Sequence, residues 1–154
     1  MRRGMTAMIA AAASAVTLLV FGLASGSAMA DVVVTVDKAK QRMFVAVDGA
    51  HRYTWSVSTG VGNTPSGTYR PQSLSRDHRS SLFNNAPMPY AIFYSGHYAI
   101  HGTVAVRQLG RRASKGCVRL HPSNAAVLFA LVQRYGAANT RIVIRDSVTN
   151  VAQR

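Results

Sequence analysis

The chain has a single cysteine, Cys117, in 154 residues. One cysteine excludes a framework of intramolecular disulfides, which small exported domains use when their hydrophobic core is too small. An unpaired cysteine is a buried inert side chain, an intermolecular bridge or a free thiol kept for chemistry. The residues around it must decide among these three roles.

Acidic residues are also scarce. Five aspartates and no glutamate stand against 18 lysines and arginines, which gives a formal net charge of +13. The basic residues are mostly arginines scattered along the chain, and no recognition-helix or aromatic RNA-binding motif accompanies them. We therefore expect no nucleic-acid partner. Beyond residue 30 the sequence has no internal repeat and no low-complexity tract.

The first 30 residues have the pattern of a secretory signal peptide. Arg2 and Arg3 precede a mostly apolar run over 8–23, and Ala28 and Ala30 form an A-x-A cleavage site. A retained signal anchor is the rival interpretation, but the run is interrupted and shorter than the roughly 20 apolar residues of a spanning helix. No cysteine lies near the site to carry a lipid. We expect an exported protein of the periplasm or cell wall, without a stable membrane anchor after cleavage.

Cleavage before Asp31 leaves residues 31–154, which suffice for one domain with a hydrophobic core and are too few for two. The mature chain keeps 16 lysines and arginines against five aspartates, a net charge of +11. Outside the membrane, such a basic surface suits contact with anionic wall polymer or lipid headgroups, an attraction that salt screens. A surface charge kept for solubility is the other interpretation.

The residue patterns predict a mainly β domain with one principal helix near its C-terminus. Runs of β-type residues bounded by turn residues predict strands at 32–36, 43–47, 53–57, 68–71, 91–94, 98–100 and 141–145. The first three should form a meander, because short turns join them. The polar segment 74–89 ends in two prolines and is predicted to be an irregular loop or substrate lid. An apolar stripe predicts a helix over 122–135, capped by His121 or Ser123.

The neighbours of Cys117 favour a reactive thiol over an inert one. Gly116 directly before it permits tight backbone turning, and Lys115 two residues before it favours the thiolate by its charge. A thiol nucleophile also needs a base. His101 is the candidate, because it follows an apolar strand at a point where a sheet presents a side chain to a cleft, 16 positions before the cysteine. His51 and His78 lie in polar surroundings and are read as surface residues.

These residues resemble the L,D-transpeptidase family, the YkuD-type catalytic domain. The family signature is a histidine, a spacer, and Ser/Thr-His-Gly-Cys followed by a hydrophobic residue and Arg or Asn. The matching positions are His101, Ser114, Gly116, Cys117, Val118 and Arg119. The segments Thr64-Pro65-Ser66-Gly67-Thr68-Tyr69 and Met88-Pro89-Tyr90 also match, so the resemblance covers nearly the whole mature chain. One position departs from the signature, because Lys115 stands where the family commonly has its second histidine.

The resemblance implies a β-sandwich-like domain and acyl transfer on peptidoglycan stem peptides, with no cofactor or metal. Cys117 would attack the donor tetrapeptide, and His101, oriented by the Gly102 carbonyl, would serve as its base. The backbone N–H groups of Gly116 and Cys117 would form the oxyanion hole. Arg119 and Ser114 would orient the carboxylates of the stem peptide or support the loop, and a purely structural ion pair is the other interpretation of Arg119. Lys115 would also contact the stem peptide. Tyr90 would line the donor cleft, although core packing suits it better.

Further consequences of the resemblance are sensitivity to carbapenems and a part in wall cross-linking and cell shape. The acceptor amine stays open, since cross-linking, hydrolysis and D-amino-acid exchange differ only in what resolves the thioester.

Two other classes of function remain to be weighed. His97, His101, Cys117 and His121 offer four nitrogen and sulfur ligands, so an extracytoplasmic metal site is conceivable. It ranks low, because the first pair sits in a short strand and His121 precedes Pro122 at a predicted helix start. The other class is a non-catalytic wall-binding module that uses the basic surface and does not need Cys117.

Overall fold

The computed structural model describes residues 31–147. The predicted signal peptide and its cleavage site lie outside these residues. Within 31–147, no helix is both long and apolar enough to cross a membrane.

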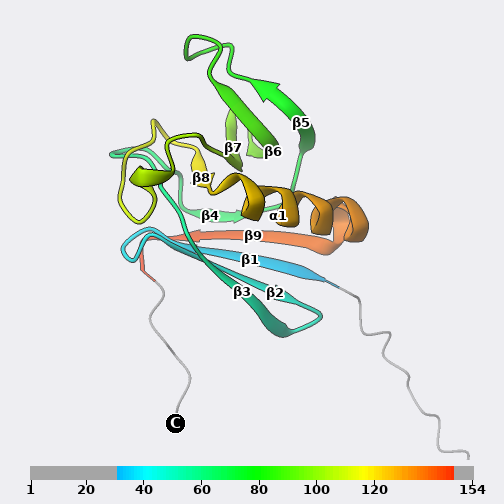
Figure 1. Cartoon of the computed structure of the whole chain (residues 1–154). Helices are drawn as coiled ribbons and strands as arrows, with labels where there is room; N and C mark the ends of the chain where they lie inside the picture. The colour runs from blue at the N-terminus through cyan, green and yellow to red at the C-terminus, as the bar shows by residue number, and fades with distance from the viewer. Residues whose placement is uncertain (1–30, 148–154) are drawn as a thin grey trace, which may run out of the picture.

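The described chain forms two β-sheets and one α-helix (Figure 1). The first sheet has the order β3-β2-β1-β9-β4. Its strands are β1 (Val32–Asp37), β2 (Arg42–Val47), β3 (Ala50–Ser56), β4 (Gly67–Tyr69) and β9 (Thr140–Arg145). Strands β1 to β3 form the predicted antiparallel meander, while β9 pairs in parallel with β1. The C-terminal strand β9 thus lies beside the N-terminal strand β1 inside the sheet.

The second sheet has the order β5-β6-β7-β8. Its strands are β5 (Ser73–Arg79), β6 (Pro87–Ser95), β7 (Tyr98–Gly102) and β8 (Val118–Leu120). Neighbours are antiparallel except β7 and β8, which are parallel. The chain between β7 and β8 includes a short 3₁₀ helix, η1 (Val106–Gln108), and a second one, η2 (Ala137–Asn139), leads into β9.

Helix α1 (Pro122–Tyr135) lies between the two sheets in Figure 1 and packs against β6 and β7. Its buried side chains include Leu128 and Phe129, which join one hydrophobic core with valines and isoleucines of both sheets. Strands β1 and β2 alternate buried and half-buried residues, as expected for strands with one face on a core. The mainly β class and the predicted bounds of the helix are therefore confirmed.

Of the two candidate caps of α1, the structure selects His121, and Ser123 lies in the first turn of the helix. His121 is the N-cap, and its Nδ1 accepts the Ser123 N–H at 3.3 Å and contacts the Ser123 hydroxyl at 2.7 Å. Pro122 takes the first helical turn, where its missing N–H costs nothing.

The prediction of an irregular loop over 74–89 was wrong. Residues 73–79 form β5, and β6 begins at residue 87, so the two make an antiparallel hairpin. The hairpin tip is tied by Ser80, whose N–H bonds to the Ala86 carbonyl and whose hydroxyl accepts the N–H groups of Leu82 and Phe83. Strand β5 lies at a sheet edge beside β6. Its sequence is polar and lacks an alternating hydrophobic pattern, so it forms a strand because it pairs with β6.

We predict that Leu128→Ala lowers the free energy of unfolding by about 2–5 kcal/mol, because it leaves a cavity between the helix and the sheets. Leu128 is fully buried. Val127→Ala on the same helix is the matched control, since Val127 is 38% exposed and its loss should stay within about 0.5 kcal/mol. Urea unfolding of both variants measures the difference. Equal losses would contradict the placement of the helix.

Candidate active site

The parallel pairing of β7 and β8 brings His101 and Cys117 to one face of the second sheet. His101 pairs with Arg119, and Ile100 pairs with Val118. Since side chains alternate along a strand, Ile100 and Val118 point into the core, and His101 and Arg119 point to the other face. Cys117, two residues before Arg119, faces the same side, and all three side chains line one cavity.

His101 is 6% exposed, and its Nδ1 lies 2.6 Å from the Gly102 carbonyl oxygen. A carbonyl only accepts, so Nδ1 carries the proton and Nε2 is left as the proton acceptor. Burial lowers the pKa of His101 to about 4, and the charges of Arg119 and His78 act in the same direction, against the Gly102 hydrogen bond. The imidazole is therefore neutral at neutral pH and able to take a proton.

The Cys117 thiol lies half-buried against the start of β7. Its Sγ is 3.8 Å from the His97 carbonyl oxygen and accepts a hydrogen bond from the Ala99 N–H. Burial raises the pKa of the thiol above its usual value, while the Ala99 N–H and the charge of Arg119 partly oppose this. A neutral histidine and a protonated thiol therefore line the same cavity at rest.

The expectation that Lys115 favours the thiolate is corrected, because Arg119 is the cation that lowers the pKa of Cys117. The Lys115 side chain is exposed and turns to the hairpin tip, with its Nζ 4.8 Å from the centre of the Phe83 ring. Arg119 is half-buried, and its guanidinium donates to Gln108 Oε1 at 3.2 Å. Arg119 is fixed on β8 beside Cys117, whereas Lys115 lies in the loop before β8 and its side chain is turned to Phe83.

Ser114 and Gly116 shape the loop that precedes the nucleophile. The buried Ser114 hydroxyl donates to the Cys117 carbonyl at 2.6 Å and accepts the Gly116 N–H at 3.1 Å. The Gly116 N–H is thus bonded to Ser114 and is not free to bind an oxyanion. Of the two expected oxyanion donors, the Cys117 N–H remains. Gly116 has φ +137°, and a Cβ there would lie 2.6 Å from a Tyr98 ring carbon and 2.8 Å from the Asn63 carbonyl. Only glycine fits this position.

Tyr90 does not line the cavities at Cys117, so its cleft role is corrected to core packing. Its ring contacts Phe129 edge-on at 5.8 Å, and the Arg76 guanidinium lies over it at 5.6 Å. The physical reason is a local irregularity in β6, where Tyr90 has φ +56° and the pairing with β5 skips this residue. The side chain is thereby turned toward the helix.

Two cavities meet at Cys117. The first, of about 230 Å³, includes His101, Thr103, Val104 and Arg119, and the second, of about 410 Å³, includes Asn63, His78, His97 and Tyr98. Both are also lined by Ser80, Phe83, Met88, Lys115 and Cys117. The residues from the β5–β6 hairpin were missed as individual site residues, because its polar tip carries no catalytic motif. The prediction of a lid over 74–89 was the one signal that pointed there.

The four candidate metal ligands are not assembled. The His97 ring packs on Tyr98 at 4.5 Å, His121 caps α1, and His101 Nδ1 is bonded to Gly102. Among residues 31–147, no group of three or more histidine, cysteine or acidic side chains is placed to hold a metal ion.

The fold and site define a β-sandwich-like domain with a histidine on β7 and a cysteine directly before the adjacent strand β8. A family model described as the L,D-transpeptidase catalytic domain, YkuD, matches residues 31–144. The chain belongs to this family. Among curated proteins, none matches the sequence.

Solved structures share the fold. An L,D-transpeptidase from Mycobacterium smegmatis is 21% identical with a TM-score of 0.66, over 75% of this chain and 59% of that one. LdtMt1 in complex with imipenem is 20% identical with a TM-score of 0.67, over 75% and 59%. L,D-transpeptidase 3 from Mycobacterium tuberculosis with a faropenem-derived adduct is 17% identical with a TM-score of 0.66, over 75% and 60%. The chain thus spans about three fifths of the length of these proteins.

We predict that alkylation of Cys117 by iodoacetamide keeps accelerating as the pH rises through the ordinary thiol range near 8.5, because burial raises the pKa of the thiol. Arg119→Gln should move the profile to still higher pH, whereas Lys115→Gln should move it less. Rates measured by intact-mass spectrometry from pH 5 to 10 give the three profiles. A plateau near pH 6, typical of a resting thiolate–imidazolium pair, would contradict the assignment.

The lowered pKa of His101 also predicts pH-dependent stability. The unfolded state, with an ordinary histidine pKa near 6.5, takes up a proton that the folded state binds only near pH 4, so stability falls as the pH drops through this window. The loss at pH 4 should be about 3 kcal/mol. Urea unfolding of wild type and His101→Gln at pH 7 and pH 4 isolates the contribution of His101. Parallel pH dependences of the two proteins would refute it.

Proposed function

We propose that the protein is a peptidoglycan L,D-transpeptidase that transfers an acyl group through Cys117. The observation that carries this proposal is that a neutral His101 on β7 and Cys117, directly before the adjacent strand β8, line one cavity of a domain of this family. The donor is a tetrapeptide stem, and the acylated bond links its third, diamino residue to the terminal D-alanine.

The chemistry follows from the two protonation states. His101 Nε2 accepts the thiol proton as Sγ attacks the donor carbonyl, and the Cys117 N–H is placed in the nucleophile loop to stabilise the resulting oxyanion. The imidazolium then gives the proton to the leaving nitrogen, the C–N bond breaks, and D-alanine departs. The donor acyl group stays on Cys117 as a thioester. An acceptor amine attacks this thioester, His101 takes the amine proton, and the thiol is restored as the new amide forms.

Two cavities that share Cys117 suit a reaction with two peptide substrates, because donor and acceptor must reach the same sulfur in turn. Lys115 lies in the wall common to both cavities, and Arg119 lines the first. Stem peptides carry carboxylates, which cations of this kind bind, Arg119 by its planar guanidinium and Lys115 as a point charge. Ser114 acts behind them by shaping the loop.

We further propose that the protein works outside the cytoplasm, in the periplasm or cell wall, where it cross-links or remodels peptidoglycan and so affects cell shape. The signal-peptide pattern of residues 1–30 supports this placement. The net charge of +11 in the mature chain supports contact with anionic wall polymer, since five aspartates cannot neutralise 16 cations.

The test uses imipenem, whose strained β-lactam carbonyl stands in for the donor amide. We predict that the folded mature protein gains one imipenem mass per chain on the peptide that carries Cys117. Cys117→Ser should lose the adduct, and His101→Ala should form it about 10²–10⁴-fold more slowly, because the base is missing. His51→Ala is the matched control, since His51 is exposed on β3, contacts Thr54 and Phe44, and does not line either cavity at Cys117.

The same proteins are then incubated with defined tetrapeptide stems, and mass spectrometry separates cross-linked dimer, tripeptide and exchanged peptide. No adduct on folded wild type, together with no change in the stems, would reject acyl transfer and leave a basic wall-binding module. A product formed equally by Cys117→Ser would reject the cysteine as nucleophile.

A further inference from the structure

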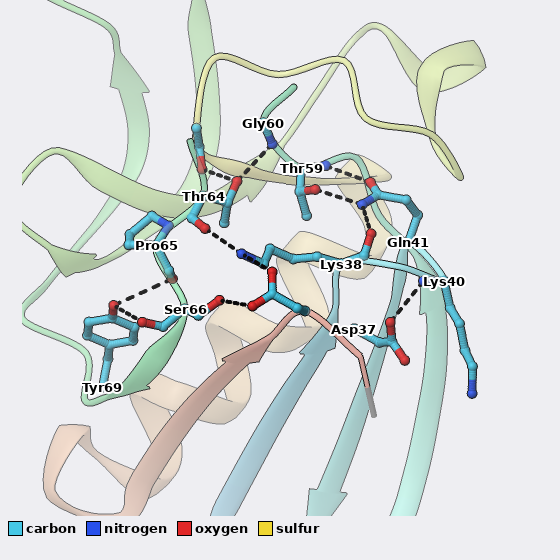
Figure 2. Close-up of polar contacts among 12 residues, drawn as sticks. Asp37, Lys38, Lys40, Gln41, Thr59, Gly60, Thr64, Pro65, Ser66 and Tyr69 are labelled. Carbon is cyan, nitrogen blue, oxygen red and sulfur yellow. Dashed lines mark hydrogen bonds and ion pairs between the residues drawn. The ribbon is translucent and has the colours of Figure 1, made fainter. Parts of the chain in front are cut away.

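A buried threonine ties the nucleophile loop to a second loop of the chain. The Thr64 side chain is 6% exposed, and its Oγ1 accepts the Gly60 N–H at 2.8 Å and donates to the Gly116 carbonyl at 2.8 Å (Figure 2). Both possible directions of this hydroxyl are therefore used inside the protein. The acceptor belongs to the residue directly before Cys117.

The two loops touch at their backbones. A Cβ on Gly60 would lie 3.0 Å from the Cα and the N of Gly116, so glycine at position 60 permits the approach. The Val61 N–H also bonds to the Ser114 carbonyl, and Gly60 and Ser114 form an isolated bridge. With this spacing, a small shift of residues 60–64 is transmitted directly to the loop that holds the sulfur.

The second loop is itself anchored to the turn between β1 and β2. The Lys38 ammonium donates to the Thr64 carbonyl at 2.9 Å and pairs with Asp146 at 3.0 Å. The Gln41 side-chain amide donates to the Thr59 hydroxyl and accepts the Thr59 N–H at 2.8 Å. Figure 2 shows these contacts as one connected set. Lys38 and Gln41 are almost fully buried, which fixes their geometry.

The anchored residues hold the nucleophile loop from two sides. The Thr59 carbonyl accepts the N–H groups of Ala113 and Ser114, both at 3.0 Å, and the Thr64 hydroxyl holds Gly116. The turn between β1 and β2 of the first sheet, acting through residues 59 and 64, thereby fixes the loop that leads into β8 of the second sheet.

We infer that Thr64 is a positioning residue, whose hydroxyl sets the orientation of Cys117 for acyl transfer through the Gly116 carbonyl. This inference rests on the proposed function, since the orientation matters for attack on a carbonyl. A sulfur displaced by about 1 Å can lose about 10²-fold in rate. A small, unhindered alkylating reagent has no oxyanion to align with the loop, so its reaction with the same sulfur is much less sensitive to orientation.

The experiment compares Thr64→Val, which removes the hydroxyl at nearly constant volume, with Thr64→Ser, which keeps it. Thr64→Val should acylate with imipenem about 10- to 100-fold more slowly than wild type, while its alkylation by iodoacetamide changes less than about 3-fold. Thr64→Ser should acylate within about 3-fold of wild type. Hydrogen exchange should rise in Thr64→Val for peptides covering 58–66 and 113–118 and stay unchanged in α1.

Thr140→Val is the matched control, because Thr140 is fully buried and its hydroxyl bonds to the Gly136 carbonyl, away from the nucleophile loop. It removes one buried hydrogen bond by the same substitution and should leave acylation within about 3-fold. If Thr64→Val does not fold, Lys38→Met serves in its place, since it releases the Thr64 carbonyl and should slow acylation in the same sense.

Wild-type acylation in Thr64→Val, equal slowing in Thr140→Val, or failure of Thr64→Ser to restore the rate would each overturn the inference. Failure of the proposed function gives a different result, because wild type itself would then form no imipenem adduct. In that event the hydrogen-exchange measurement decides. Increased exchange confined to the two loops in Thr64→Val would still support the positioning of the loop, and unchanged exchange would reject it.

Discussion

The parallel pairing of β7 with β8 is the constraint on which the site depends. It aligns His101 with Arg119 and, through side-chain alternation, turns Cys117 to the same face, so one short register fixes the proposed base, the proposed nucleophile and the cation together. The opposite faces of these strands carry Ile100, Val118 and Leu120 into the core, and helix α1 packs near them. The hydrophobic core therefore holds His101, Cys117 and Arg119 in place, because a change of register by one residue would expose the core side of β8 and bury Cys117.

Burial of this face sets the chemistry of the pair. Removing His101 and Cys117 from water disfavours both charged forms, which keeps the imidazole neutral and the thiol protonated. The resting pair is therefore a neutral imidazole and a neutral thiol, in contrast to a thiolate–imidazolium ion pair. Arg119 acts on both groups in the direction of deprotonation, and its own position is held by Gln108.

The nucleophile loop depends on contacts from the other sheet. Ser114 closes the loop locally, and the buried set around Thr64, Gln41 and Lys38 fixes it from β1, β2 and the end of β9. The hydrogen-bonding groups in this set satisfy one another, as buried polar groups must. The domain thus couples its two sheets by polar contacts at the site and by apolar contacts elsewhere.

The sequence by itself determined the mainly β class, the meander, the bounds of α1 and the family, since apolar periodicity and the run around Cys117 are local signals. Tertiary structure decided the rest. Strand β5 forms from a polar segment because β6 pairs with it, and Tyr90 turns into the core because β6 is irregular there. Arg119, and not the expected Lys115, lowers the pKa of the thiol, because strand register places it beside Cys117. The hydrogen bond from Thr64 to Gly116 likewise depends on contact between two loops. Such contacts span up to 52 positions of sequence, and no local pattern records them.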